Sequence, residues 1–89
     1  DAIVILLEEK GLERSSTDFA TFMERLGSIG KPITFILGSG IGLHESLKEI
    51  ANYNVSLSKL TFPHNLARIL LVEQLYRSCM IMSGRNYHK

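Results

Sequence analysis

The sequence has little cysteine and no long apolar run. Its single cysteine, Cys79, cannot form a disulfide within the chain, which is typical of proteins in reducing compartments. The sequence contains no stretch of about 18 apolar residues, so no membrane span is predicted. Residues 1–89 also contain no leader pattern with a small-residue cleavage site. We therefore expect a soluble protein of the cytoplasm that has no membrane partner.

Metal-ligand spacing is also missing. The three histidines and the cysteine lie far apart in the sequence, without the short separations that zinc ligands show. These residues are His44, His64, Cys79 and His88. We therefore expect no metal site.

The net charge is small, +1, but the charges are unevenly divided. Residues 1–45 carry four Lys or Arg against seven Asp or Glu, whereas residues 46–89 carry six against two. A polyanion would therefore meet the C-terminal half. With 89 residues, 45% of them hydrophobic, the chain predicts one small domain whose core is barely sufficient alone, so help from a partner subunit is plausible.

Short apolar runs predict three strands. AIVILL at 2–7 and ITFIL at 33–37 are continuous and rich in branched residues, as expected of strands buried on both faces. NVSLS at 54–58 predicts a weaker strand. The polar stretch EEKGLERSS, which follows the first run, predicts a turn.

Helical periodicity lies between and after these runs. The first helix has hydroxyl-bearing N-cap candidates at 15–17 and glycines that end it at 27 and 30. Its apolar face consists of Phe19, Phe22, Met23 and Leu26.

Two further helices follow. One begins near Leu43, with Leu47 and Ile50 on one face, and the other runs from Pro63 to about Met82. On this last helix we expect four residues to face inward: Leu66, Ile69, Leu70 and Tyr76. The alternation of strands and helices predicts an α/β fold, a parallel sheet with flanking helices.

A glycine-rich turn, GSGIG, follows the second strand at 38–42. Ligands of parallel sheets sit beyond the carboxyl ends of the strands, and glycines there let backbone amides approach a ligand closely. The pattern is neither G-x-G-x-x-G, because Leu43 occupies the last position, nor a P-loop. Taken alone, it fits a tight turn without a ligand equally well.

Longer motifs are more specific. SLSKLTFPHNLARILLVEQLYRS at 56–78, followed by the ending NYHK, closely resembles the RlmH family, the smallest knotted SPOUT methyltransferases. VILLEEKG at 4–11, SSTDFA at 15–20 and FILGSGIGL at 35–43 are similar to that family's second strand, a helix start and its first cofactor loop. The resemblance therefore extends along the whole chain.

The chain differs from the family pattern in two places. Ser39 stands where the cofactor loop usually has a glycine, and the family's first strand and helix are absent from these residues. We therefore interpret residues 1–89 as a single SPOUT domain that is the C-terminal part of a longer family chain; a reduced member of the family is the alternative.

The resemblance implies a fold and an activity that periodicity does not predict. It implies a C-terminal trefoil knot, and an enzyme that uses S-adenosylmethionine to methylate N3 of a pseudouridine in large-subunit (23S) ribosomal RNA. Ribosomal RNA or the ribosome would be the partner, and a homodimer would form in which the tail of one subunit completes the site of the other. The alternative is a non-catalytic nucleotide- or RNA-binding α/β module.

The resemblance also implies a cofactor pocket. By motif match its residues are Leu7, Gly38, Leu57, Ser58, Lys59, Leu60, Thr61 and Phe62. Three of these residues fall at predicted strand ends, where a pocket for adenosine is expected. Without the resemblance, the leucines would be interpreted as core and Lys59 as a solvated charge.

Methyl transfer to a ring nitrogen needs in-line placement and loss of a proton, but no covalent intermediate. We therefore expect Cys79 to be buried packing. Family match predicts catalytic roles for Arg77, Tyr87 and His88: Arg77 for an anionic group, Tyr87 for the base, and His88 as proton acceptor or positioning group. Glu73 would pair with Arg77 one turn away. We expect residues 86–89 to be loosely held until RNA binds. The alternative for Tyr87 and His88 is a frayed, solvated tail without a catalytic role, and the alternative for Arg77 is an ordinary surface ion pair.

Overall fold

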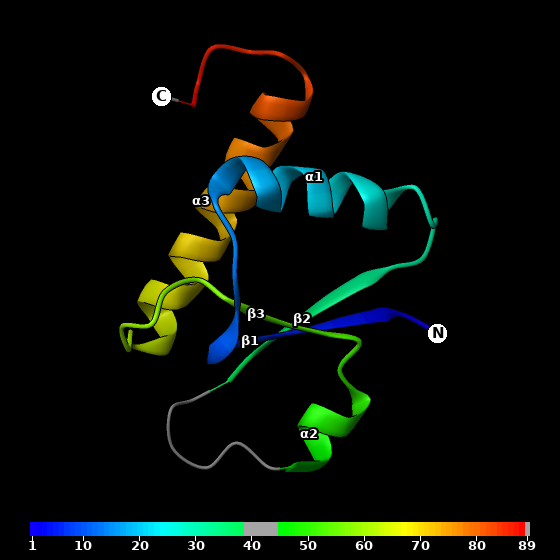
Figure 1. Cartoon of the computed structure of the whole chain (residues 1–89), viewed down its shortest axis with the longest axis vertical. Coiled ribbons are helices and arrows are strands. Elements are labelled where there is room, and N and C mark those ends of the chain that lie inside the picture. The colour runs from blue at the N-terminus through cyan, green and yellow to red at the C-terminus, as the bar shows by residue number, and fades with distance from the viewer. Residues whose placement is uncertain (39–44, 89) are drawn as a thin grey trace.

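The computed structural model describes residues 1–38 and 45–88. Within these residues three strands alternate with three helices, in the order that the sequence predicts (Figure 1). None of the described helices is long and apolar enough to cross a membrane. The elements are β1 (Ile3–Glu13), α1 (Ser16–Gly27), β2 (Ile33–Leu37), α2 (Glu45–Ile50), β3 (Tyr53–Ser56) and α3 (His64–Met82).

β1 is the central strand of a parallel sheet with the order β2-β1-β3. Residues 3–7 of β1 pair in register with β2, and residues 5–7 pair with β3 on the other side. Ile5 and Leu6 are completely buried, as expected of a continuous apolar run with a strand on each side. The predicted α/β class and parallel sheet are therefore confirmed.

β1 extends beyond its apolar run, so the turn predicted for EEKGLERSS is wrong over its first part. Leu7 and Leu12 both lie opposite Val55, and residues 8–11 form an irregular excursion between them. Gly11 allows this close approach, because a Cβ there would lie 2.7 Å from the carbonyl carbon of Val55 and 2.8 Å from its nitrogen. The stretch has no apolar periodicity, which is why the sequence indicated a turn.

α1 covers one side of the sheet with the apolar face that the sequence predicts. The Ser15 side chain caps the helix by accepting the Asp18 N–H at 3.1 Å. Phe19, Phe22 and Leu26 are buried in the same cluster as the side chains of β1, and Met23 packs against that cluster. The prediction for this helix is therefore confirmed.

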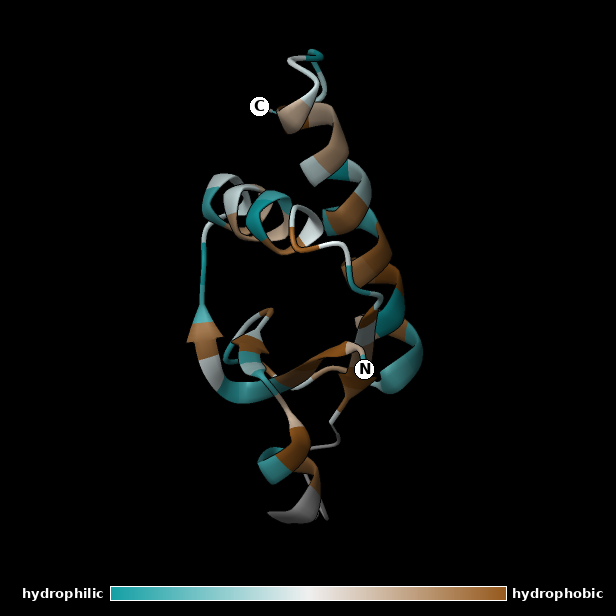
Figure 2. Ribbon diagram, turned by 90° about the vertical axis from the view of Figure 1, so that its right-hand side faces the viewer, coloured by the Kyte–Doolittle hydropathy of each residue, from teal (hydrophilic) through white to brown (hydrophobic). Residues whose placement is uncertain are grey.

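α2 is a short helix that lies on the opposite side of the sheet from α1 (Figures 1 and 2). Its predicted start, Leu43, lies outside the described residues. Leu47 is partly buried, but Ile50 is mostly exposed. The predicted apolar face of this helix is therefore only half correct.

α3 begins after Pro63 and ends at Met82, as predicted, but the predicted inward face is wrong for three of its four residues, since only Leu70 is partly buried. Leu66, Ile69 and Tyr76 are 42%, 63% and 52% exposed. The apolar residues of α3 are spread over all sides of the helix (Figure 2), so periodicity does not specify which side packs against α1. The buried residues are instead Leu71 and Ser78, whose hydroxyl donates to the Gln74 carbonyl at 2.8 Å.

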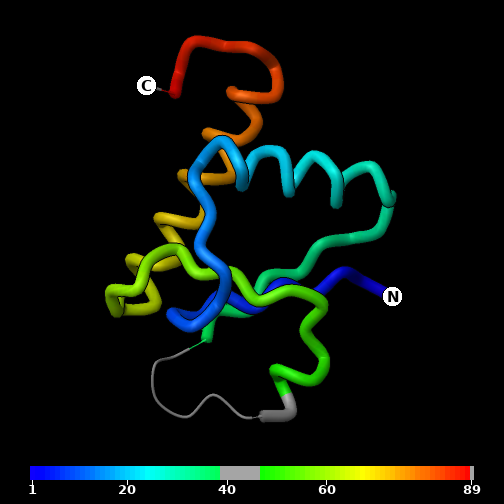
Figure 3. Tube along the Cα trace, in the orientation of Figure 1, coloured from blue at the N-terminus to red at the C-terminus, as the bar shows by residue number. Residues whose placement is uncertain are grey.

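Cys79 is exposed, so its predicted role as buried packing is also wrong. The same ambiguity of α3 causes both errors. Figure 3 follows the chain path from the sheet into α3 and the C-terminal tail. The trefoil knot stays a prediction, since the described residues do not show one.

Gly11→Ala tests the close approach of Gly11 in β1 to the backbone of β3. The added methyl would collide with backbone, which cannot rotate away, so we expect a loss of about 1–3 kcal/mol in the free energy of unfolding. Chemical denaturation followed by circular dichroism measures it. The matched control is Gly27→Ala, where nothing lies within 4 Å of the new methyl and stability should be unchanged or slightly higher. Equal stability of the two variants would contradict the contact.

Candidate functional site

A cavity lies at the carboxyl end of β2, beside Leu7, where the regular pairing of β1 with β2 ends; this is the edge of a parallel sheet at which a ligand site is expected. Its empty volume is about 420 Å³, part of it open to solvent. Seven of the eight predicted cofactor residues line this cavity: Leu7, Gly38, Leu57, Ser58, Leu60, Thr61 and Phe62. The topology therefore brings together residues that are up to 55 positions apart in the sequence.

Gly38 joins this cavity in a way that differs from the sequence prediction. Its N–H donates to the Leu7 carbonyl at 2.8 Å, which extends the pairing of β1 with β2 by one bond. The Gly38 amide is therefore already bound and is not a free donor for a ligand. Ser39, Gly40 and Gly42 lie outside the described residues.

The segment 57–62 is shaped by short-range hydrogen bonds. The Ser56 hydroxyl donates to the Ser58 carbonyl at 2.9 Å, and the Ser58 hydroxyl accepts the Leu60 N–H at 3.0 Å. The Thr61 hydroxyl donates to a carboxylate oxygen of Glu9 at 2.6 Å. The turn is thus tied to the excursion of β1 across the cavity.

Lys59 does not line the cavity, unlike its neighbours. Its side chain is 82% exposed, and Nζ lies 4.0 Å from a carboxylate oxygen of Glu13. Glu8 and Glu9 line the cavity instead, and sequence reasoning missed both. Their position directly after the buried part of β1 was the available signal, but the stretch was interpreted as a turn.

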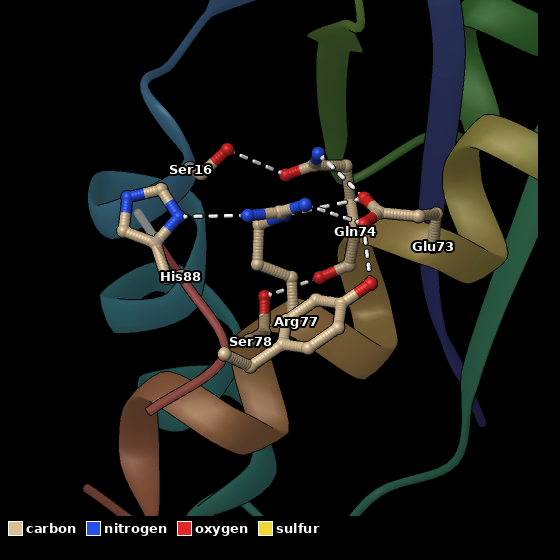
Figure 4. A network of polar contacts seen from close by, with 7 residues as sticks. Ser16, Glu73, Gln74, Arg77, Ser78 and His88 are labelled. Carbon is tan, nitrogen blue, oxygen red and sulfur yellow. Dashed lines mark hydrogen bonds and ion pairs between the residues drawn. The ribbon is translucent and has the colours of Figure 1, made fainter. Parts of the chain in front are cut away.

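A second cluster of polar side chains lies where α3 meets α1 and the tail (Figure 4). Arg77 donates to both carboxylate oxygens of Glu73, with Nη2 at 2.6 Å and Nε at 3.3 Å, which confirms the predicted pair. The Tyr87 hydroxyl donates to Glu73 at 3.0 Å, and Arg77 Nη1 lies 3.0 Å from His88 Nδ1. Gln74 also donates to Glu73 at 3.0 Å. The three predicted catalytic residues are therefore in one network centred on Glu73.

The end of the tail is held against α3, so the expectation of a loose tail is wrong for Tyr87 and His88. The Tyr87 ring meets the Tyr76 ring edge-on, with centroids 5.0 Å apart. The guanidinium carbon of Arg77 lies 4.9 Å from the centre of the Tyr87 ring. Because Tyr76 was expected to face inward, no apolar anchor for the tail was predicted.

The network shifts the titration of its members. The hydrogen bond from Arg77 lowers the pKa of Glu73, and the same bond raises the pKa of Arg77. The pKa of Tyr87 is raised because its hydroxyl donates to the Glu73 carboxylate. At neutral pH the network therefore holds an ionised carboxylate, a guanidinium and a protonated phenol.

The hydrogen bond with Arg77 also fixes the tautomer of His88. A guanidinium has donors and no acceptor, so Nδ1 of His88 must accept from Nη1. A neutral ring that accepts at Nδ1 carries its proton at Nε2. His88 in this arrangement offers a hydrogen-bond donor at Nε2, and it can accept a proton there only if the contact with Arg77 is lost.

The described residues contain no group of three or more His, Cys, Asp or Glu side chains that could hold a metal ion. His64 lies exposed at the first turn of α3, while His44 lies outside the described residues.

Comparison with known proteins identifies the family. A family model described as "Predicted SPOUT methyltransferase" matches residues 1–88. The chain belongs to the SPOUT methyltransferase family. It is 46% identical over 90 residues to the putative ribosomal RNA large subunit methyltransferase H of Methanococcus maripaludis, covering 100% of this chain and 57% of the relative.

Bacterial relatives give the same result. The chain is 45% identical over 87 residues to the ribosomal RNA large subunit methyltransferase H of Desulfitobacterium hafniense, covering 97% of this chain and 54% of the relative. It is also 45% identical over 87 residues to the protein of that name from Prochlorococcus marinus, covering 98% of this chain and 59% of the relative. The resemblance seen in the sequence is confirmed, and the chain spans somewhat more than half the length of these curated relatives.

This member of the SPOUT family contains a second cavity, with an empty volume of about 690 Å³. It shares Leu57, Ser58 and Phe62 with the first cavity and has Ser16 and Gln74 on its wall. Because the Ser16 hydroxyl donates to Gln74 at 2.7 Å, this wall adjoins the Glu73 network. The second cavity therefore lies between the predicted cofactor pocket and the predicted catalytic residues.

Proposed function

We propose that this chain forms the methyl-donor pocket and the catalytic end of an S-adenosylmethionine-dependent methyltransferase. Its substrate would be N3 of a pseudouridine in large-subunit (23S) ribosomal RNA, met in the cytoplasm on the RNA or on the ribosome. The observation that carries the proposal is the convergence of seven motif residues around one cavity at the strand ends. Membership of the SPOUT family and the names of the relatives support it.

The residues of the first cavity suit such a donor. Leu37, Leu57 and Leu60 provide apolar walls for an adenine ring, and the Glu8 and Glu9 carboxylates suit hydroxyl groups and positive charge. When bound, S-adenosylmethionine supplies an electrophilic methyl group. The protein's contribution is to orient the acceptor ring and to favour loss of its N3 proton.

The Glu73 network can assist that proton loss. A ring that loses its N3 proton becomes an anion, and the Arg77 guanidinium favours that charge. The Nε2 proton of His88 supplies a hydrogen-bond donor to a ring carbonyl, and the Tyr87 ring offers a stacking surface while its hydroxyl donates to Glu73. His88 therefore acts in this proposal as a positioning donor in the arrangement described, and solvent or an undocked His88 takes the proton.

We also propose that the protein forms a homodimer through the outer face of α3, defined as Leu66, Ile69, Val72 and Tyr76. These side chains follow one side of the helix at spacings of three and four residues, and all are exposed in the single chain. An 89-residue domain buries a smaller fraction of its surface than a larger domain does, so a two-fold contact would add to its stability. Tyr76 on this face also contacts the tail, which would place the tail beside the partner subunit. The knot implied by the family remains part of this proposal.

Binding of S-adenosylhomocysteine tests the donor pocket. Gly38→Val adds a branched side chain at the cavity wall and should weaken binding by at least about tenfold in calorimetric titration. Lys59→Ala is the matched control, because Lys59 lies in the same motif but not on the wall, and its affinity should stay within about twofold. Equal effects of the two variants, with unchanged circular dichroism, would contradict this placement of the pocket.

Removal of the tail tests the catalytic end. Deletion of residues 86–89 removes Tyr87 and His88 from the network, so single-turnover methylation of ribosomes should fall by about 10²–10⁴-fold. Affinity for S-adenosylhomocysteine should not change. Arg85→Met is the control, since this exposed basic residue precedes the network and should leave the rate nearly unchanged. Methylation at the parent rate after the deletion would rule out this site, and donor binding without any transfer would favour the non-catalytic module.

Sedimentation equilibrium tests the dimer. The parent protein should be dimeric at micromolar concentration, and Ile69→Glu should shift it to the monomer by placing a charge on the outer face of α3. Ile29→Glu makes the same chemical change on an isoleucine that is exposed after α1, and it should remain dimeric. A parent protein that is monomeric would refute this interface.

A further inference from the structure

The second cavity contains a positive charge without a partner. Arg14, which follows β1, lies on its wall and is the only charged residue among the described residues that line it. One guanidinium nitrogen of Arg14, Nη1, is buried and has no hydrogen-bond partner within the described part of the chain. The guanidinium carbon lies 4.1 Å from the centre of the Phe22 ring, which holds the group in place on one side.

The neutral groups of this wall do not satisfy Arg14. The Ser16 hydroxyl donates to Gln74, and the Ser56 hydroxyl donates to the Ser58 carbonyl. The described residues provide no ion pair for Arg14 either. A partly buried guanidinium that lacks an acceptor within the protein is suited to a carboxylate or phosphate from outside.

The charges of the two cavities are opposite. Glu8 and Glu9 line the first cavity, and Arg14 lines the second. The cavities share a wall formed by Leu57, Ser58 and Phe62. A ligand that spans this wall would therefore meet carboxylates at one end and a guanidinium at the other. S-adenosylmethionine has a cationic sulfonium next to its nucleoside on one side, and at its other end an α-carboxylate, the one anionic group of the molecule, beside an α-ammonium.

We infer that Arg14 binds the carboxylate of the donor's amino-acid part in the second cavity, while the adenosyl part occupies the first. The inference rests on the proposed function, because it assigns a new contact to the same donor. Arg14 is a binding residue in this account and takes no part in the chemical step. The contact would also direct the donor toward the Glu73 network, whose Gln74 lies on the same cavity wall.

Two ligands that differ only in the carboxylate test this inference. S-adenosylhomocysteine has the carboxylate, whereas decarboxylated S-adenosylhomocysteine keeps the nucleoside, the sulfur and the amine. In calorimetric titration the parent should prefer the first by about tenfold to a hundredfold, the range of a charge-assisted hydrogen bond. Arg14→Met should abolish the preference by weakening S-adenosylhomocysteine alone. Arg25→Met, which removes the same charge from an exposed position on α1, should keep the preference.

The outcomes separate this inference from the proposed function. If neither ligand binds the parent, the donor pocket itself is refuted. If both bind and Arg14→Met weakens them equally, or not at all, Arg14 does not contact the carboxylate. Weaker RNA binding by Arg14→Met with an unchanged ligand preference would assign a backbone phosphate to Arg14 and overturn the inference.

A measurement on the parent protein covers the case in which Arg14→Met does not fold. The Arg14 Nε–H resonance should shift when S-adenosylhomocysteine is added and should shift much less with the decarboxylated ligand. Equal shifts with both ligands would overturn the inference without any variant.

Discussion

The burial of β1 between two parallel strands is the constraint on which the rest of the structure depends. Ile5 and Leu6 are fully buried, and β2 and β3 pair with the same short stretch. Parallel pairing makes the regular part of the sheet end at one edge, so Leu7, Gly38 and the segment 57–62 meet there. The cavity is therefore a direct result of strand direction.

Glu73 has a comparable role at the other end of the molecule. It accepts hydrogen bonds from Arg77, Gln74 and Tyr87, which come from its own helix and from the tail. Gln74 in turn accepts a hydrogen bond from Ser16 at the start of α1. One carboxylate thus joins the tail to the helix that carries the predicted catalytic arginine, and its hydrogen bonds raise the pKa of both Arg77 and Tyr87.

The sequence was sufficient to predict an element and its buried residues where the apolar pattern fits only one arrangement. A continuous apolar run in β1 and a one-sided apolar face on α1 each fit one arrangement, and Phe19, Phe22 and Leu26 are buried as predicted. It was insufficient for α3, whose apolar residues surround the helix, so that the side facing α1 depends on tertiary packing. The tail was misjudged for the same reason, since its anchor Tyr76 is on the side that was expected to be buried.

Other features of the site depend on contacts between distant segments. No local pattern shows that Gly11 touches the backbone of β3, or that Lys59 points away from a cavity that its neighbours line. Motif resemblance identified seven of the wall residues, but it could not identify Glu8, Glu9 or Arg14 as their companions. These three residues join the walls only through the tertiary structure, which brings distant segments together.

The excursion at residues 8–11 has a consequence for the entropy of ligand binding. Both of its ends are fixed, because Leu7 and Leu12 lie opposite the same residue of β3 and Gly11 touches that strand. A segment of this kind has few conformations to lose when a ligand arrives, in contrast to a long surface loop of the same composition. The backbone that presents Glu8 and Glu9 is therefore in place before binding, and the Glu9 carboxylate is also held by the Thr61 hydroxyl, so little backbone entropy is lost when a ligand arrives.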